Sequence, residues 1–172
     1  MPRQLVTEAV MVAIYGQLLA PSAPVEYLIP YTTVLELYEL QSSTEPLMES
    51  PQEDQHVKQK IGELISYYEE PFNRKKISKA LQVPWAKSAS IPLDDHVSII
   101  IVGAMDTAQY GEFFDPIETE LLLTAQRFQQ PLLTDQVEWI GRIIEAGVPV
   151  QVYDIEDFEF ALENNDFTTG PA

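Results

Sequence analysis

The chain has 172 residues, of which 45% are hydrophobic, and it carries 27 Asp and Glu against 10 Lys and Arg, a net charge of -17. This size and apolar content fit one compact domain, and the negative charge repels nucleic acids and anionic membranes over most of the surface. The absence of cysteine excludes disulfides, zinc ribbons and thiol catalysis. Because the sequence contains no run of 18 apolar residues and no signal-peptide pattern, we expect a cytoplasmic protein that does not enter a membrane.

The first twenty residues support two interpretations. Residues 7–20 read as a helix, because Val10, Ile14 and Leu18 recur at helical spacing. Residues 4–12 read alternatively as a strand. The helix is favoured, since fourteen residues with a helical stripe exceed the usual length of a strand.

The next stretch predicts a strand and a helix. Residues 25–30 are entered and left by proline and form the strand. Thr33 and Glu36 have capping-box spacing and open a helix that runs through Leu40. The polar, proline-broken residues 41–52 are expected to be a mobile loop.

The middle of the chain predicts two helices and one central strand. Residues 53–70 form an amphipathic helix, and a second helix capped by Asn73 ends at residues 83–85. Residues 86–95 are then a loop. Residues 96–103 are dense in β-branched side chains, which indicates a strand buried on both faces in the middle of a sheet.

Residues 115–154 read as helix, strand, helix, strand. Asp115 and Glu118 form a capping box at the start of the first helix. The strands, 131–134 and 148–153, flank a helix at 135–146 that is followed by Gly147. Two short strands on either side of such a helix should be parallel with a right-handed crossover.

A short terminal helix at 154–164 and a disordered tail at 165–172 complete the chain. We therefore expect a single α/β domain over residues 1–164. Its sheet should be mostly parallel, with four or five strands flanked by helices.

These segments resemble PIN domains, the metal-dependent nuclease fold of many bacterial toxins and RNA-processing enzymes. In that family an acid opens a helix with an alanine-rich end, a strand closing in Thr-Asp follows, and a further helix leads into a Gly-Val-x-Val strand. The matching residues are Glu118, Ala125, Leu133-Thr134-Asp135 and Gly147-Val148-Pro149-Val150, and residues 29–37 match the segment whose Glu-Leu pair supplies another acid, here Glu36-Leu37. The resemblance implies a three-layer sandwich. The first strand of the family normally carries an Asp, whereas Glu8 is the only acid in that part of this chain.

The candidate catalytic residues are Glu36, Glu118 and Asp135, and the same three with Asp115 are the candidate metal ligands. Glu8 is the alternative to Asp115 as the fourth acid. Glu36 and Asp135 each follow a predicted parallel strand, where ligand sites of open sheets lie. Converging carboxylates are the ligands that Mg²⁺ or Mn²⁺ prefers. The resemblance implies that such ions activate a water to attack an RNA phosphate. Helix capping explains the same three main acids without any metal.

Half of the cations fall within 14 residues: Arg74, Lys75, Lys76, Lys79 and Lys87. The first four are the candidate nucleic-acid-binding residues, and nearby Trp85 is suited to stack a base. The alternative is the solvated face of a helix in an acidic protein.

Two functions remain open. The first is a PIN-like ribonuclease dependent on Mg²⁺ or Mn²⁺, or a catalytically degenerate relative. The second is a non-enzymatic acidic module that holds a protein partner at the same sheet end or through the loop at 41–52. The expected partner is accordingly RNA or a protein. The protein partner could be a second copy of this chain, in a homodimer.

Overall fold

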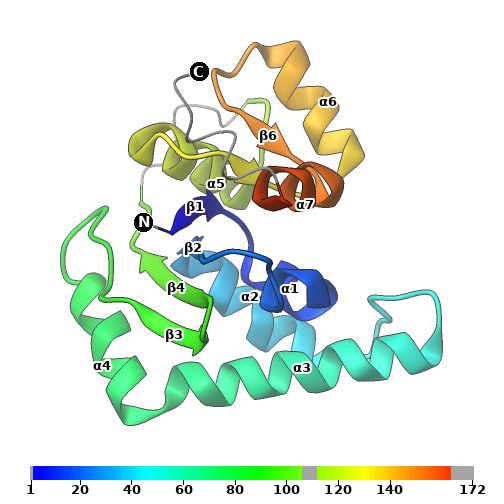
Figure 1. Cartoon of the computed structure of the whole chain (residues 1–172), viewed down its shortest axis with the longest axis vertical. Coiled ribbons are helices and arrows are strands. Elements are labelled where there is room, and N and C mark those ends of the chain that lie inside the picture. The colour runs from blue at the N-terminus through cyan, green and yellow to red at the C-terminus, as the bar shows by residue number, and fades with distance from the viewer. Residues whose placement is uncertain (1, 106–111, 164–172) are drawn as a thin grey trace.

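The structure, a computed structural model, describes residues 2–105 and 112–163 (Figure 1). The strands in this part of the chain are β1 (Arg3–Val6), β2 (Val25–Pro30), β3 (Ile91–Asp94), β4 (Val97–Val102), β5 (Leu132–Leu133) and β6 (Val152–Tyr153). The helices are α1 (Ala9–Ile14), α2 (Tyr31–Ser42), α3 (Pro51–Glu69), α4 (Pro71–Ala80), α5 (Pro116–Phe128), α6 (Val137–Ala146) and α7 (Ile155–Glu163), with a 3-10 turn η1 at Gly16–Leu19. The predicted tail at 165–172 lies outside the described residues.

The strands form one mixed sheet in the order β3-β4-β2-β1-β5-β6. β4, β2, β1, β5 and β6 are parallel, which includes the predicted crossover from β5 to β6, and β3 pairs antiparallel with β4. The expectation of a single, mostly parallel α/β domain is confirmed, but the sheet has six strands among the described residues and is not purely parallel. Residues 86–95 were expected to be a loop, and they contain β3. Its short run includes Pro92, a residue tolerated mainly on edge strands, so the sequence pattern was too weak to indicate a strand.

Successive apolar side chains of the parallel strands enter two separate hydrophobic clusters. In β4, Val97, Ile99 and Ile101 belong to one cluster, and Ile100 and Val102 belong to the other. The alternation follows from the two-residue period of a strand. The prediction that this strand is buried on both faces is therefore confirmed.

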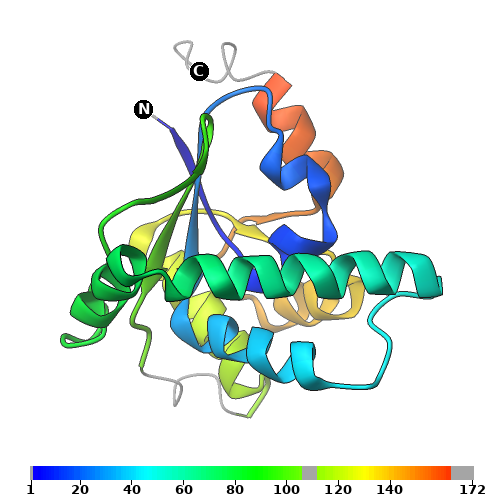
Figure 2. The same cartoon turned by 90° about the horizontal axis from the view of Figure 1, so that it is seen from below.

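Helices cover both faces of the sheet. The first cluster receives buried side chains from α1, α2, α3, α4 and α7, and the second receives them from α5 and α6. Figure 2 shows the long α3 lying across the molecule next to α2. Its buried residues recur at spacings of three and four, as predicted: Val57, Ile61, Leu64, Ile65 and Tyr68.

The N-terminal segment differs from both interpretations of the sequence. Residues 3–6 form β1, and α1 begins only at Ala9, so the expected helix from Thr7 to Ala20 is wrong in its start and in its length. Leu5 and Val6 are fully buried between β2 and β5. Tertiary pairing therefore overrides the helical stripe of this segment. As a result, Glu8 lies just beyond the carboxyl end of a strand.

The loop between α2 and α3 is shorter than predicted and is attached to α3. Asp54 accepts hydrogen bonds from the N–H groups of Leu47 and Met48, at 2.5 and 3.3 Å. Lys58 donates to the carbonyls of Ser43 and Glu45, at 3.1 and 3.0 Å. The first turns of α3 therefore fix the path of this loop.

Candidate functional site

The order of the parallel strands changes direction at β1. From β1 the chain moves to β2 and β4 on one side, and it then crosses to β5 and β6 on the other side of β1. In open parallel sheets, ligands bind outside the carboxyl ends of the strands at such a switch point. The carboxyl ends of β1 and β5 therefore mark the place where the topology alone puts a functional site.

Two buried threonines hold the strand ends together at this point. Thr7 Oγ1 donates to the carbonyl of Leu133 at 3.0 Å, and the Thr7 N–H donates to the carbonyl of Leu28 at 3.1 Å. Thr33 Oγ1 accepts from the N–H of Ala9 at 3.1 Å. The ends of β1, β2 and β5 are therefore fixed relative to one another.

Four carboxylates lie around the switch point and form what we name the carboxylate crevice. They are Glu8 after β1, Asp135 after β5, Glu36 in α2 and Asp115 at the N-cap of α5. Burial, reinforced by the charges of the other three, raises the pKa of Glu8 to about 7. Burial also raises the pKa of Glu36, and the charges of Asp115 and Glu39 add to this effect. The crevice therefore brings together acids that repel one another when ionised.

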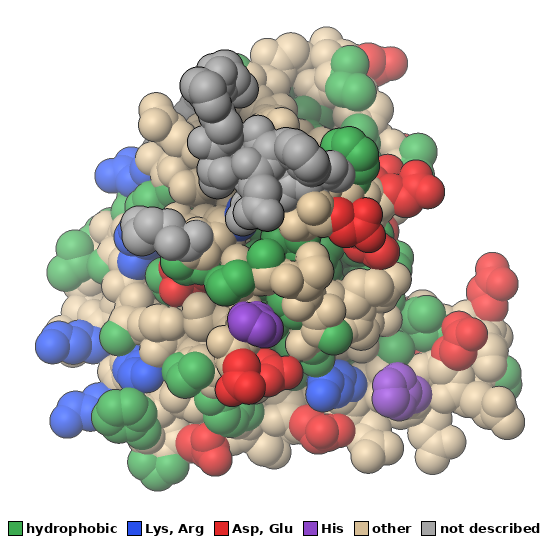
Figure 3. Space-filling view, in the orientation of Figure 1, with side chains coloured by type: hydrophobic (Ala, Val, Ile, Leu, Met, Phe, Trp, Pro, Cys, Tyr) green, Lys and Arg blue, Asp and Glu red, His purple; other side chains and the backbone are tan. Residues whose placement is uncertain are grey.

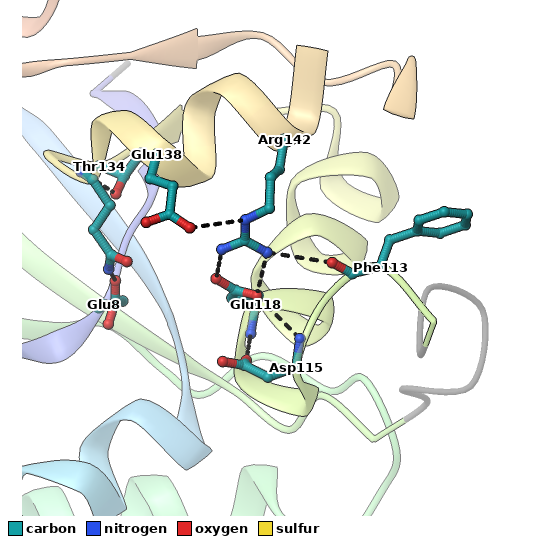
Figure 4. A network of polar contacts seen from close by, with 8 residues as sticks. Glu8, Phe113, Asp115, Glu118, Thr134, Glu138 and Arg142 are labelled. Carbon is teal, nitrogen blue, oxygen red and sulfur yellow. Dashed lines mark hydrogen bonds and ion pairs between the residues drawn. The ribbon is translucent and has the colours of Figure 1, made fainter. Parts of the chain in front are cut away.

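Glu118, the third predicted catalytic residue, is bound to Arg142 of α6 (Figure 4). The guanidinium donates to both carboxylate oxygens, at 3.1 and 2.6 Å. Glu118 and Asp115 also form the predicted capping box. Burial alone would raise the pKa of Glu118, but the bonds from Arg142 and from the Asp115 N–H, with the charge of Arg142, outweigh it and lower the pKa. Glu118 is therefore an ionised structural partner of Arg142.

Asp135 does not cap α6. The helix begins at Val137, and its N-cap residue, Gln136, makes no side-chain capping bond. The Asp135 carboxylate instead accepts a 2.5 Å hydrogen bond from the hydroxyl of Tyr15. Burial, and then this bond and the charge of Asp135, raise the pKa of Tyr15 to about 12. The hydroxyl therefore stays protonated and remains a donor to Asp135 at neutral pH.

Glu36 does not cap α2 either. The helix starts at Tyr31, and Thr33 uses its hydroxyl to donate to the carbonyl of Pro30 at 2.9 Å. The capping explanation therefore holds for Asp115 and Glu118 but fails for Glu36 and Asp135. The two acids that it leaves unexplained are those expected at the carboxyl ends of parallel strands.

Within residues 2–105 and 112–163, no group of three or more His, Asp or Glu side chains is placed to hold a metal ion. Three of the acids have donors from the protein instead: Gln136 Nε2 donates to Glu8 at 2.8 Å, Tyr15 donates to Asp135 and Arg142 donates to Glu118.

The predicted nucleic-acid-binding residues lie on α4. Arg74, Lys75 and Lys79 are exposed, and Lys76 is half-buried because it donates to the carbonyl of Ser90 at 2.7 Å. The charges that shift the pKa of Glu8 and Glu36 are those of other carboxylates. The structure therefore places the predicted basic and acidic residues in two separate groups.

Arg142, Tyr15 and Gln136 contact the candidate acids and were not expected from the sequence. Of these three residues, only Arg142 is indicated by the sequence pattern. It lies three residues after the buried Trp139, at the border of the buried face of α6, and four residues after Glu138. Nothing local indicated Tyr15 or Gln136, because their partners lie 120 and 128 residues away.

Several surface hollows are lined by residues outside the crevice. One of about 600 Å³ lies between α2 and α3 and is lined by residues such as Gln41, Gly62 and Tyr67. Another, of about 480 Å³, adjoins the end of α5.

Among the described helices, none combines the length and the apolar character needed to cross a membrane. No protein-family model matches the chain, and no curated protein matches it either.

Proposed function

We propose that this protein is a catalytically degenerate relative of PIN domains, which binds nucleic acid without cleaving it. The observation that carries the proposal is that Glu8, Asp135 and Glu118 each accept a hydrogen bond from a protein donor. The sequence resemblance to PIN domains supports the family, and the carboxylate crevice at the switch point supports the place of the ancestral site.

The donors remove the reason for a cation to bind. A metal site needs several ionised carboxylates whose mutual repulsion the ion relieves. Here the guanidinium of Arg142 neutralises Glu118, and Glu8, with a pKa of about 7, takes up a proton instead. A divalent ion would therefore compete with the guanidinium of Arg142 for Glu118 and with the proton for Glu8. The chain therefore balances the charge of these acids with its own groups.

Thermal melting with and without divalent ions tests the proposal. An ion that binds only the folded state at 100 times its dissociation constant stabilises the protein by about 2.7 kcal/mol. We expect the melting midpoint to be the same in chelator and in millimolar Mn²⁺ or Mg²⁺. A midpoint that rises with Mn²⁺ in the wild type, but not in Glu36→Gln or Asp135→Asn, would overturn the degenerate assignment.

A cleavage assay provides the second test. We expect a labelled oligouridylate to stay intact in Mn²⁺ while it binds the protein equally well in chelator. The matched controls are Glu36→Gln and Asp135→Asn, which retain the size of each side chain without its charge. Metal-dependent cleavage that both substitutions abolish would identify an active nuclease.

A protein-binding function is the second candidate, because α6 exposes apolar side chains beside the crevice. Val137 and Ile144 lie seven residues apart, on one face of the helix, and are 80% and 72% exposed. Exposed apolar residues grouped in this way mark interaction surfaces. Sedimentation of the wild type and of the double variant Val137→Ser, Ile144→Ser tests the homodimer. A wild type that stays monomeric at all concentrations would count against it.

A further inference from the structure

Two segments of this acidic chain contain no acid at all. Residues 71–93 and 121–134 hold none of the 27 Asp and Glu residues, yet they hold six of the ten Lys and Arg. These six are Arg74, Lys75, Lys76, Lys79, Lys87 and Arg127. Positive and negative residues are therefore strongly separated along the chain, although its net charge is -17.

The fold joins these two segments on one face. Lys87 Nζ lies 5.1 Å from the centre of the Phe128 ring, and the guanidinium of Arg127 lies 5.0 Å from the centre of the Trp85 ring. The end of α5 is thereby attached to the chain that follows α4. In Figure 3 most of the visible Lys and Arg side chains lie along the left border, on the side of α4 and the end of α5. We name the surface formed by the six cations the basic face.

Aromatic rings are part of the basic face. Phe72 is 71% exposed, and Lys76 Nζ lies 4.6 Å from the centre of its ring. A phenylalanine this exposed gains little from packing within the protein, and its ring is available to an external π-system. Cations beside rings are the combination with which proteins hold unstacked bases and their phosphates.

The basic face reaches the edge of the sheet on which the crevice lies. The Trp85 N–H donates to the carbonyl of Gly103 at 2.8 Å, and Lys87 pairs with Val102 at the carboxyl end of β4. β4 adjoins β2, whose carboxyl end leads into α2 and Glu36. The basic face and the carboxylate crevice are therefore distinct surfaces at one edge.

We propose that the basic face, and not the carboxylate crevice, binds single-stranded nucleic acid, with the phosphates on the cations of α4 and a base on Phe72. This inference rests on the proposed nucleic-acid-binding function and locates it. The acids of the crevice repel phosphate, whereas the cations of the two acid-free segments attract it. An exposed ring suits the open bases of a single strand better than a duplex, in which the bases are already stacked.

Fluorescence anisotropy with a labelled 20-nucleotide oligouridylate tests the cations. The variant Lys75→Gln, Lys79→Gln removes two exposed charges and retains good helix formers. For single strands, each lost phosphate contact reduces the slope of log affinity against log salt by about 0.7, so two contacts are worth about 25-fold at 0.1 M salt. The matched control is Gln55→Glu, Gln59→Glu at two exposed positions of α3, which changes the net charge equally and should leave affinity within about twofold of wild type.

A second pair of variants tests the ring. Loss of one stacked base lowers affinity by about 5- to 150-fold. We expect Phe72→Ala to fall in this range, while Phe160→Ala, which alters a ring 68% exposed on α7, binds as wild type does. Glu8→Gln in the crevice should bind at least as tightly as wild type.

The outcomes separate the two proposals. If the wild type binds neither RNA nor DNA 20-mers, the nucleic-acid-binding function fails, and this inference fails with it. If RNA binds and the α4 and Phe72 variants match their controls, only the inference fails, and the cations are a solvated helix face. Tighter binding of a 20-base-pair duplex would overturn the single-strand preference. Tighter binding of polyglutamate, lost in the double variant, would assign the face to an acidic protein.

Discussion

Replacing Glu8 by Gln measures how much burial and the neighbouring charges destabilise the ionised form of Glu8 in the folded protein. Burial and three neighbouring carboxylates raise the pKa of Glu8 from 4.5 to about 7. A carboxyl whose pKa is higher in the folded than in the unfolded state keeps its proton longer when folded, so stability falls as the pH rises from 4.5 to 7. Gln stays neutral and retains an oxygen that can accept the 2.8 Å bond from Gln136.

The expected effect is large enough to measure. One pKa unit corresponds to about 1.4 kcal/mol, so a shift of this size is worth about 3 kcal/mol in full. Between pH 5 and pH 8 the wild type should lose about 2 kcal/mol more stability than Glu8→Gln does. The raised pKa of Glu36 acts in the same direction in both proteins, so the comparison removes its contribution.

Urea denaturation at pH 5 and at pH 8 provides the measurement. We expect Glu8→Gln to be more stable than wild type at pH 8 and close to it at pH 5, with unchanged slopes. Glu145→Gln, which changes an exposed acid on α6, is the control and should follow the wild type at both pH values. An equal loss of stability in wild type and Glu8→Gln would refute the raised pKa of Glu8 in the folded protein.

Three further changes test the core, the ion pair and a helix end by urea denaturation. Ile100→Ala, at a position 8% exposed, should cost about 2 to 5 kcal/mol; an unchanged midpoint would contradict the packing of β4. Arg142→Gln should lower the free energy of unfolding at neutral pH by leaving Glu118 without its cation, and this loss should vanish as the pH falls through the lowered pKa of Glu118. Gly147→Ala should cost about 1 kcal/mol, because the residue has a φ of +67°, and Gly147→Asn should cost less.

Elements with local signals were predictable from the sequence. The capping box of Asp115 and Glu118 begins α5 as predicted, and Gly147 follows α6 in the left-handed conformation that its position implied. Both features depend on residues within four positions of each other. The β-branched run that forms β4 needed no partner to be recognised.

The first strand was not predictable by the same means. Its four residues continue into α1 without a proline or glycine between them, so no local signal separates Val6 from Ala9. The pairing of β1 with β2 and β5 decides the boundary. This boundary also places Glu8 in the crevice, because a strand that ends at Val6 puts Glu8 just beyond its carboxyl end.

The candidate site was predictable in position and not in chemistry. Glu36 and Asp135 lie at the expected edge because parallel strands carry their carboxyl ends to the same side. The partner of Glu118 lies 24 residues away and that of Asp135 lies 120 residues away, and no local pattern indicates such pairs. The sequence therefore does not distinguish Glu118, which is paired with Arg142, from the other candidate acids.

The parallel sheet also sets the time at which the crevice is assembled during synthesis. β1 is made first, yet one of its edges waits for β5, because the partner of Thr7 lies 126 residues further along the chain. Contacts between such distant segments form slowly, because the intervening chain must lose the entropy of loop closure before these contacts add to stability. β1, β2 and β4 can pair once residue 102 has emerged from the ribosome, but Glu8 and Asp135 come together only after β5 follows. Until then the nascent chain carries an open strand edge at β1, and this edge is the segment most exposed to aggregation.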